Sequence, residues 1–575
     1  MGTILSKFKQ NLISELIDSV DSPVTSITIN AGGSGYANGE SLVFTGEGLP
    51  ANGVIFTNNV GEITYAVVTN GGNYEIPPSV TITTANGFGA SLTAVLTNQH
   101  FYLYAGRSKP FTVDTTPDPN YQDDYDSFFF QYDQMMFGKK VSNTDIAFMA
   151  QKYVWTANSV YTEYDDKDQT IVNEQFYVLT STNEVFKCIY NNGGAPSTVE
   201  PSNTSSTGLP TTLSDGYRWK YMYSLSGQQR TKFETNSYIP VIEDANVKSG
   251  AIDGGIFNMK VETGGFNYPT LSGSILSING NKIVVANSGS AQTNYYANCT
   301  LTVFGASNAT TNRRIIQSYM EGTNNVIIVA NTFNSNQISQ GYSFQIAPTL
   351  YVTGDGIGFE GYLKMNQSSN SVVSVEVIDS GSGYNSADAK IISGTGFGSG
   401  ASVRPIISPK GGHGSDVFGE LFCQHVGITG EFSNAYGFPT GVTIRTVGIL
   451  KNPKAYGSNS LYTNNEFDQT VTIAVANTSV QNFSNGEIVI GNVSQARGAV
   501  AFSNSSTLVI TGYTGNLIIG EILTGQDSNV QFTVANVQTT ADLKLYSGDV
   551  LYTQNITPTL RSNNSSQQIK LVVKL

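Results

Sequence analysis

Charged residues are scarce in this chain. Asp, Glu, Lys and Arg make up 13% of its 575 residues, against roughly 25% in an average soluble domain. With 30 basic and 43 acidic residues the formal net charge is −13, and the clustered Lys and Arg that neutralise a phosphate backbone are lacking. This balance argues against a basic nucleic-acid-binding protein, and we expect no nucleic-acid partner.

Cysteine is rare, and long apolar runs are missing. Cys188, Cys299 and Cys423 are far apart and odd in number, so stability must come from packing rather than from a disulfide framework. No apolar run approaches the roughly 20 residues that cross a bilayer, and charges interrupt the first twenty residues, where a signal peptide would be apolar. We expect folding in a reducing compartment, no membrane insertion and no export by a recognisable N-terminal signal.

Motifs of nucleotide, metal and hydrolase chemistry are also missing. The chain has no Walker-type Gly-Lys-Ser/Thr, no His-Glu-x-x-His and no Gly-x-Ser-x-Gly. Cys423 and His425 form the one close Cys/His pair, but a structural zinc site needs about four ligands and a nucleophilic dyad also needs an oxyanion hole. We therefore expect no enzymatic activity, no metal and no cofactor.

Aspartates cluster in two places. The members are Asp123, Asp124 and Asp126, and then Asp165, Asp166 and Asp168. Paired acids could hydrolyse a glycosidic bond in a suitable cleft, and alternating acids could bind Ca²⁺, but neither run has the closing Glu of a calcium loop. We interpret both runs as solvated loops; a glycan-degrading enzyme using Asp123, Asp126 or Asp165 is the alternative.

Aromatic residues and glycine are plentiful, which argues against a disordered chain. Aromatics reach 11% and there are 59 glycines. Leu5, Phe8, Leu12, Leu16 and Val20 recur at helical spacing and predict an N-terminal helix that ends before Pro23. We interpret it as a helix that packs on its own core, with docking on a partner as the alternative. A second helix is expected at 143–152.

A glycine–tyrosine element recurs among strand patterns in the rest of the chain. It stands at 33–36, 71–74, 264–268 and 381–384, and two copies are followed by a second glycine cluster, at 87–90 and 396–398. The pattern predicts a turn with positive φ at glycine, followed by a Tyr that folds over a hairpin. The turn residues singled out are Gly35, Tyr36, Tyr74, Tyr268, Gly383 and Tyr384. Sugar stacking on these tyrosines is the alternative interpretation.

A second repeat lies near the C-terminus. Gly486-Glu487-Ile488 with Gly491 matches Gly520-Glu521-Ile522 with Gly525, at the same spacing. Such repeats indicate small stacked β units rather than one large sheet. The sequence therefore predicts a mainly β, multi-domain protein with a β-sandwich-like core, few helices and inserted small repetitive β domains.

Three segments outside the glycine-rich units resemble one family. Residues 101–111 (Phe-Tyr-Leu-Tyr-Ala-Gly-Arg-Ser-Lys-Pro-Phe), 215–223 (Asp-Gly-Tyr-Arg-Trp-Lys-Tyr-Met-Tyr) and 547–552 (Ser-Gly-Asp-Val-Leu-Tyr) are similar, in collinear order, to the baseplate wedge protein of T-even-type contractile-tailed bacteriophages, the product of gene eight. The matching positions are Gly106, Arg107, Phe111, Asp215, Gly216, Tyr217, Trp219, Gly548 and Tyr552.

The resemblance divides the chain into a wedge-like core and three insertions. The core comprises an N-terminal helix at 1–21 and segments 99–269, 408–469 and 539–575, whereas the glycine-rich β inserts occupy 22–98, 270–407 and 470–538. Insertions at loops cost little when the ends of the insert lie close together, as small β units allow.

A structural role in the virion follows from the resemblance. It implies a homodimer without enzymatic activity that binds other wedge proteins in the tail baseplate, assembled in the cytoplasm of the infected bacterium, with tail fibre proteins as further candidate partners. The inserts are expected to add outer contacts. The alternative is a receptor-binding, adhesin-like tail component that binds host glycans through the β inserts.

Overall fold

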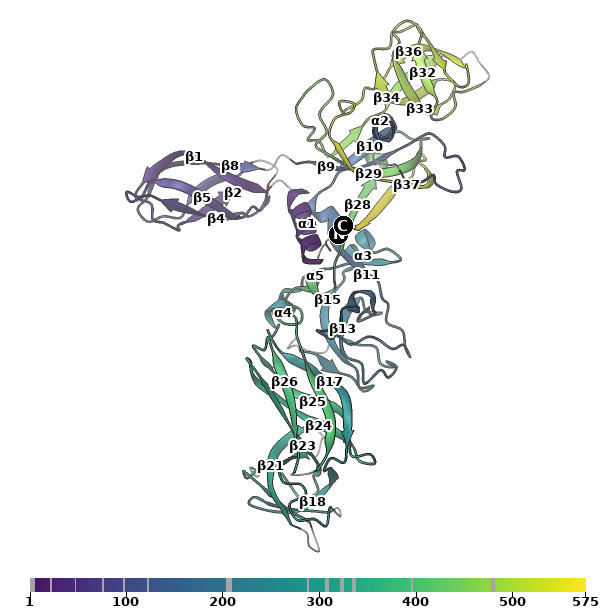
Figure 1. Ribbon diagram of the computed structural model, residues 1–575. Helices are drawn as coiled ribbons and strands as arrows, with labels where there is room; N and C mark the ends of the chain where they lie inside the picture. Colours follow the sequence, from purple (N-terminus) through teal and green to yellow (C-terminus); the bar gives the residue numbers. More distant parts are fainter. Residues whose placement is uncertain are drawn as a thin grey trace. The chain divides into compact units, whose positions relative to one another are not determined.

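The computed structural model describes residues 6–20, 23–46, 48–74, 77–96, 99–120, 124–202, 209–286, 289–305, 310–320, 325–333, 338–394, 397–476 and 481–574. Leu5, Asp123 and Gly396, which the sequence analysis singled out, lie outside these ranges. Of the described residues, 50% are in strands and 8% in helices, which confirms the mainly β, multi-domain prediction (Figure 1). It divides into a first unit, 1–149 with 231–235 and 424–575, and a second unit, 150–230 with 236–423.

The first unit contains two antiparallel sheets that bury a common core. One has the order β30-β10-β9-β29-β37 and in the other β28 pairs with both β11 and β38. Leu103, Phe137 and Val447 from the first sheet share one apolar cluster with Ile428 and Leu571 from the second. The bounds are β9 Phe101–Gly106, β10 Met135–Lys140, β11 Ile146–Gln151, β28 His425–Phe432, β29 Thr443–Lys451, β30 Glu466–Asp468, β37 Asp549–Leu560 and β38 Gln567–Lys574.

Helix α1, Ser6–Val20, packs on this core. Ile13 and Val20 are 0% and 3% exposed, which confirms the interpretation as a packing helix, but Leu12 is 40% exposed. The predicted buried face was therefore wrong at Leu12, because the neighbouring Ile13 is buried instead. Two overlapping helical stripes share Leu16 and Val20, and packing against the sheets selects the one that contains Ile13.

The helix expected at 143–152 is wrong. Only Asn143–Asp145 forms a 3₁₀ turn (η1), and strand β11 follows directly. Ile146 pairs with Ile428 of β28, so the ladder to a distant strand overrides local helix propensity.

Residues 24–96 form a six-stranded sheet with the order β1-β8-β7-β2-β4-β5 and a two-stranded β3-β6 pair. Val24 at the start of the first strand pairs with Leu96 at the end of the last, so the ends of this unit lie side by side. The bounds are β1 Val24–Ser34, β2 Ser41–Thr45, β3 Gly48–Leu49, β4 Asn52–Thr57, β5 Ile63–Asn70, β6 Asn73–Tyr74, β7 Ser79–Ile82 and β8 Phe88–Leu96.

Residues 471–537 form a closed barrel with the strand order β31-β34-β33-β32-β35-β36. Its first and last strands are also paired, with Ile473 opposite Val537. The bounds are β31 Val471–Ala476, β32 Ile488–Gly491, β33 Arg497–Ser503, β34 Thr507–Thr514, β35 Ile522–Gly525 and β36 Gln531–Val537.

The second unit combines a four-stranded sheet, β12-β13-β15-β14, with a longer β region. That region begins with β17 and ends with β27, which pair from Ile256–Ile407 to Phe266–Ser399. Between them lie the β24-β25 pair and a seven-stranded sheet, β18-β19-β22-β21-β20-β23-β26. The pairing with β27 thus begins before the predicted insert boundary at 270.

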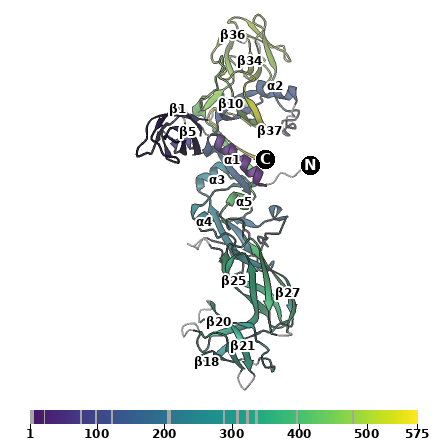
Figure 2. The same ribbon diagram turned by 60° about the vertical axis from the view of Figure 1, so that its left-hand side comes forward.

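The strands of the second unit are β12 Tyr177–Leu179, β13 Glu184–Tyr190, β14 Thr211–Thr212, β15 Arg218–Ser224, β16 Tyr238–Pro240, β17 Ile256–Phe266, β18 Leu271–Asn279, β19 Lys282–Val285, β20 Cys299–Phe304, β21 Thr310–Met320, β22 Asn325–Val329, β23 Ser343–Gly354, β24 Ile357–Asn366, β25 Ser371–Ser382, β26 Ala387–Ile392 and β27 Ser399–Ile407. The remaining helices of the chain are α2 Tyr125–Asp133, η2 Ile171–Asn173, α3 Gly227–Phe233, α4 Ala245–Ser249, α5 Val417–Glu420 and η3 Asn434–Tyr436 (Figure 2). Among the described residues, no helix has the length and apolar character of a membrane span.

Candidate functional site

Three of the four glycine–tyrosine elements fold in the same way. In each, the residues three and one before the tyrosine have left-handed φ between 59° and 77°: Gly33 and Gly35, Gly265 and Asn267, and Gly381 and Gly383. This confirms the predicted positive-φ turns. Asn267 takes the place of a glycine because asparagine tolerates this backbone region better than other side chains.

The tyrosine of each element folds over a glycine that lies one residue before a strand: Gly87 before β8, Gly398 before β27 and Gly356 before β24. A Cβ added at Gly87, Gly398 or Gly356 would overlap the ring of Tyr36, Tyr268 or Tyr384, respectively. The Tyr36 hydroxyl accepts a hydrogen bond from the amide of Ala90 at 3.3 Å, and that of Tyr268 from Ala401 at 3.2 Å. Each element is thus a turn closed by a buried aromatic plug.

Tyr74 closes a shorter variant of the element. Its hydroxyl accepts from the amide of Ala51 at 2.8 Å, and its side chain is 1% exposed. Tyr36, Tyr268 and Tyr384 are also buried, at 9%, 5% and 5% exposure. None of the four rings offers an open face for sugar stacking, so their geometry favours the turn-plug interpretation.

The repeat in the barrel is reciprocal. The Glu521 carboxylate, 4% exposed, accepts hydrogen bonds from the amide of Ile518 in its own half and from the amides of Val493 and Ser494 in the other half. Glu487 repeats the pattern, as its carboxylate accepts from the amides of Ser484, Asp527 and Ser528. Each glutamate therefore holds the turn of the opposite repeat, and a Cβ at Gly491 would meet the Glu521 carboxylate at 2.6 Å.

The first wedge-like motif closes a turn after β9. Arg107 has φ 60° and is 8% exposed; its guanidinium lies 4.3 Å from the centre of the Phe111 ring and donates to Asp118 at 2.6 Å. A Cβ on Gly106 would meet the carbonyl oxygen of Gln134 at 2.6 Å, so this close strand approach requires glycine. These three motif residues form one packed cluster.

The second motif anchors a loop in the second unit. The Asp215 carboxylate accepts from the amides of Thr198, Val199 and Tyr217. Gly216 has φ 84°. Tyr217 stacks on Trp219 with ring centres 5.6 Å apart, and both side chains are at most 2% exposed.

The third motif belongs to the first unit. Gly548 has φ 78°, and its carbonyl oxygen accepts from the hydroxyl of Tyr132 at 2.7 Å. Tyr552 in β37 packs against the core, and its hydroxyl donates to Gln554 at 2.8 Å. All three motifs therefore serve packing and turn geometry.

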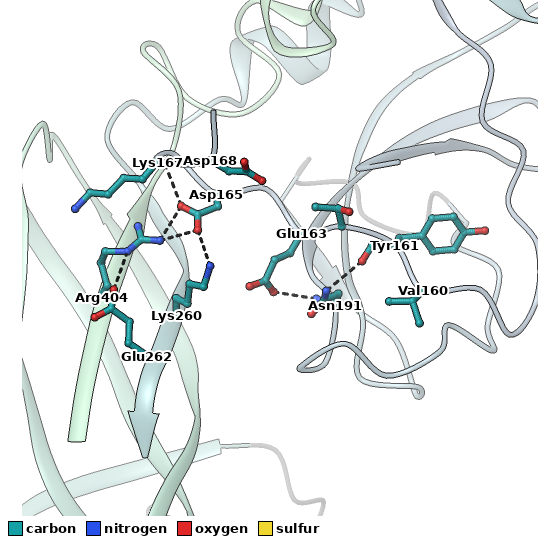
Figure 3. A pocket seen from close by; sticks show the side chains of 11 residues that line it. Val160, Tyr161, Glu163, Asp165, Lys167, Asp168, Asn191, Lys260, Glu262 and Arg404 are labelled. Atoms are coloured by element: carbon teal, nitrogen blue, oxygen red, sulfur yellow. Dashed lines mark hydrogen bonds and ion pairs between the residues drawn. The ribbon is translucent and has the colours of Figure 1, made fainter. Parts of the chain in front are cut away.

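A polar pocket of about 670 Å³ lies in the second unit (Figure 3). Most of the side chains of the 160–168 segment line it together with Asn191, and β17 and β27 supply Lys260, Glu262 and Arg404. Asp165, from the second acid cluster, accepts from the Arg404 guanidinium at 2.6 Å and from Lys260 at 3.0 Å. It is only 7% exposed, so the interpretation of this cluster as a solvated loop is wrong for Asp165, because two cations from distant strands neutralise it after folding. Arg404 also donates to Asp166 at 2.8 Å.

The acids of this pocket differ in electrostatic state. Burial raises the pKa of Asp165, but the bonds from Arg404, the Lys167 amide and Lys260 outweigh it and lower the pKa to about 2. Burial raises the pKa of Glu163, whose carboxylate accepts from the amide of Asn191 at 3.2 Å. Asp165 is therefore a fixed anion, which makes it unsuited to act as the general acid of a glycosidase.

Beside the pocket, Tyr164 covers a buried charge cluster. Lys187 Nζ lies 2.8 Å from Glu420 Oε2 and 3.1 Å from His413 Nδ1, and 4.1 Å from the centre of the Tyr164 ring. Burial alone would raise the pKa of Glu420, but Lys187 and His413 lower it to about 2. Burial and the Lys187 charge lower the pKa of His413 to about 4. Burial lowers the pKa of Lys187 as well, although the Glu420 charge and the hydrogen bond that Lys187 donates to Glu420 oppose this. The cluster is thus a Lys187–Glu420 ion pair beside an imidazole whose protonation is disfavoured.

The other candidate groups are less suited to chemistry. Asp124 caps the N-terminus of α2 by accepting from the amide of Ser127. Cys423 is fully buried, and burial raises the pKa of its thiol far above the ordinary range. Burial lowers the pKa of His425. Within the described part of the chain, no group of three or more His, Cys, Asp or Glu side chains could hold a metal ion.

Most residues of this site carry no signal in the sequence that could have identified them. Glu163, Lys260 and Arg404 lie far apart in the chain and carry no local pattern. Lys187 did carry a signal, because a lysine inside the apolar strand Phe186-Lys187-Cys188 must find a buried partner.

Comparison with known proteins leaves the family open. No protein-family model matches the chain, and no curated protein matches it significantly.

Proposed function

We propose that the protein is a structural subunit of the baseplate wedge of a contractile-tailed bacteriophage. In this role it acts as a homodimer, links neighbouring wedge proteins and takes part in assembly and in the rearrangement that accompanies contraction. Its place is the tail baseplate of the virion, and tail fibre proteins are further candidate partners. The mechanism is mechanical: rigid β units hold neighbours until interfaces with two packings of similar free energy switch.

The observation that carries this proposal is how the glycine-rich units join the rest of the chain. Each begins and ends with a pair of antiparallel strands: β1 with β8, β17 with β27, and β31 with β36. Units attached in this way extend a scaffold without interrupting its sheets. Two of the collinear wedge-like motifs lie between these units and the third follows the last one, and the motif residues serve packing and turn geometry.

The pocket chemistry is consistent with a structural role. Asp165 and Arg404 join residues 160–168 to β27 through an ion pair with side-chain exposures of 8% and 15%. Asp165 is held as an anion and so cannot itself donate the proton that a hydrolase needs, whereas burial raises the pKa of Glu163 in the same pocket. The pair is better suited to fixing a β unit on its base.

The first experiment is the solution mass of the purified chain, measured by size exclusion with light scattering. We expect twice the chain mass, as for an isologous dimer. A trimer would contradict the proposal and favour a fibre or receptor-binding protein. The second experiment labels contractile-tailed virions with an antibody against the chain, and we expect label at the baseplate. Label elsewhere on the virion, or none, would overturn the proposal.

A further inference from the structure

Helix α2 carries an aromatic face that is only partly buried. Tyr125, Phe128, Phe129 and Tyr132 stand at positions i, i+3, i+4 and i+7 and so share one side of the helix. Tyr132, at the C-terminal end, is 3% exposed, whereas Tyr125, Phe128 and Phe129 are 83%, 42% and 45% exposed. The helix lies against β34 (Figures 1 and 2). The stripe that normally packs a helix on a core is thus open over its first turn.

Tyr546 extends the same face. Its ring centre lies 5.2 Å from that of Phe129, and its side chain is 38% exposed. Together, the exposed fractions of Tyr125, Phe128, Phe129 and Tyr546 equal about two fully exposed aromatic side chains. This corresponds to roughly 400 Å² of accessible surface. Exposed apolar patches of that size are often functional on a monomer, and aromatic residues are enriched in protein interfaces.

The surroundings of this face are acidic. The sequence has six aspartates and no Lys or Arg between Lys109 and Lys139. Two of these aspartates, Asp114 and Asp118, are paired with Arg445 and Arg107, and Arg497 interacts with Asp133 and Tyr546. Asp126 lies on the helix itself, and Asp133 accepts from the Tyr546 hydroxyl at 2.7 Å. On its other side, α2 already receives a cation, because the Arg107 guanidinium lies 5.8 Å from the centre of the Phe130 ring. Aromatic faces with acidic neighbours attract guanidinium and ammonium groups.

We propose that Tyr125, Phe128, Phe129 and Tyr546 form a docking site for a basic segment of a partner protein, whose Arg or Lys side chains stack on the exposed rings. The charge pattern selects this occupant. A second copy of the chain would bring the same aspartates against each other and adds another net charge of −13. The site does not depend on the proposed function, since any assembly could supply such a segment.

The test measures binding of synthetic peptides to the full-length protein by fluorescence anisotropy. One peptide alternates Arg and Leu, and a second of equal length alternates Glu and Leu. We expect the arginine peptide to bind, the glutamate peptide not to bind, and the double variant Phe128→Ser/Phe129→Ser to weaken binding about tenfold. The control variant Tyr65→Ser/Phe88→Ser removes two rings that are 61% and 69% exposed in the 24–96 unit, and should bind as the native chain does.

A second variant keeps the test valid if the double variant is unstable. Tyr125→Ser removes the outermost ring, which is 83% exposed and therefore contributes little to folding; it should weaken binding about threefold. Equal affinity of the Tyr125→Ser variant and the native chain for the arginine peptide would overturn the proposal. So would equal binding of both peptides, or self-association in light scattering that Tyr125→Ser abolishes, because the occupant would then be a second copy.

Discussion

Two glycines near the buried Tyr36 ring, Gly87 and Gly89, allow steric overlap with the ring to be tested separately from backbone strain. A Cβ at Gly87 would overlap the Tyr36 ring, but Gly87 lies outside the left-handed region of φ. Gly89 has φ +80°, and a Cβ there would have only an ordinary contact, 3.8 Å from the Cα of Gly33. Gly87→Ala therefore probes packing, and Gly89→Ala probes backbone strain at the same hairpin.

The expected costs differ in size and in origin. Gly89→Ala costs about 1–2 kcal/mol of left-handed strain, offset by about 0.4–1 kcal/mol from the stiffer unfolded chain, which leaves about 1 kcal/mol. Gly87→Ala must expel the Tyr36 ring and costs about 3 kcal/mol. In a Tyr36→Ala background the overlap is gone, so Gly87→Ala should cost nearly nothing and the coupling between the two sites should be about 3 kcal/mol.

The assay is amide hydrogen exchange of the full-length chain, followed in peptides that cover 88–96. The amide of Ala90 donates to the Tyr36 hydroxyl and so reports on the plug. Because 1.4 kcal/mol is a factor of ten, Gly87→Ala should speed exchange about 100-fold and Gly89→Ala about fivefold. Equal effects of the two substitutions would refute the reasoning, as would a Gly87→Ala effect that persists in full without Tyr36.

Three further outcomes are expected. Burial raises the pKa of Glu521, but hydrogen bonds from the amides of Ser494 and Ile518 outweigh it and lower the pKa. The stability that the Glu521 carboxylate adds to the fold is therefore fully present above its unfolded pKa of about 4.3, and it is lost as the pH falls through the folded pKa. Glu521→Gln should destabilise the barrel by about 1–3 kcal/mol at neutral pH, and hydrogen exchange should show this difference shrinking on acidification rather than staying constant. Lys187→Met leaves Glu420 buried without its cation and should lower the free energy of unfolding by about 3–5 kcal/mol. Adding Glu420→Gln should recover most of this loss. Thermal melting followed by tryptophan fluorescence reports on it, because both tryptophans, at 155 and 219, belong to the second unit; an unchanged melting curve would contradict the prediction. Deleting residues 22–98 should leave a folded core, because Val24 and Leu96 are paired neighbours that a short linker can replace; loss of all soluble protein would count against this.

Local geometry followed from the sequence, because a residue's own side chain limits its backbone. Glycines at a fixed distance before tyrosine predicted left-handed turns, and the structure has them at Gly35 and Gly383. The matched Gly-Glu-Ile segments predicted repeated β units, and they lie in one barrel. The strand patterns punctuated by glycine clusters predicted a mainly β chain, and the many aromatic residues argued against a disordered one.

Tertiary structure decided what lies opposite each of these groups. Sequence could not tell that Glu487 and Glu521 each hold the turn of the other repeat, because the closure of the barrel brings the two halves together. It missed the pairing of Asp165 with Arg404, since the two residues meet only when β27 pairs with β17. It also placed a helix where β11 pairs with β28. In each case long-range pairing, rather than local propensity, determined the partner, because the free energy of a charge or a strand depends on the groups that surround it after folding.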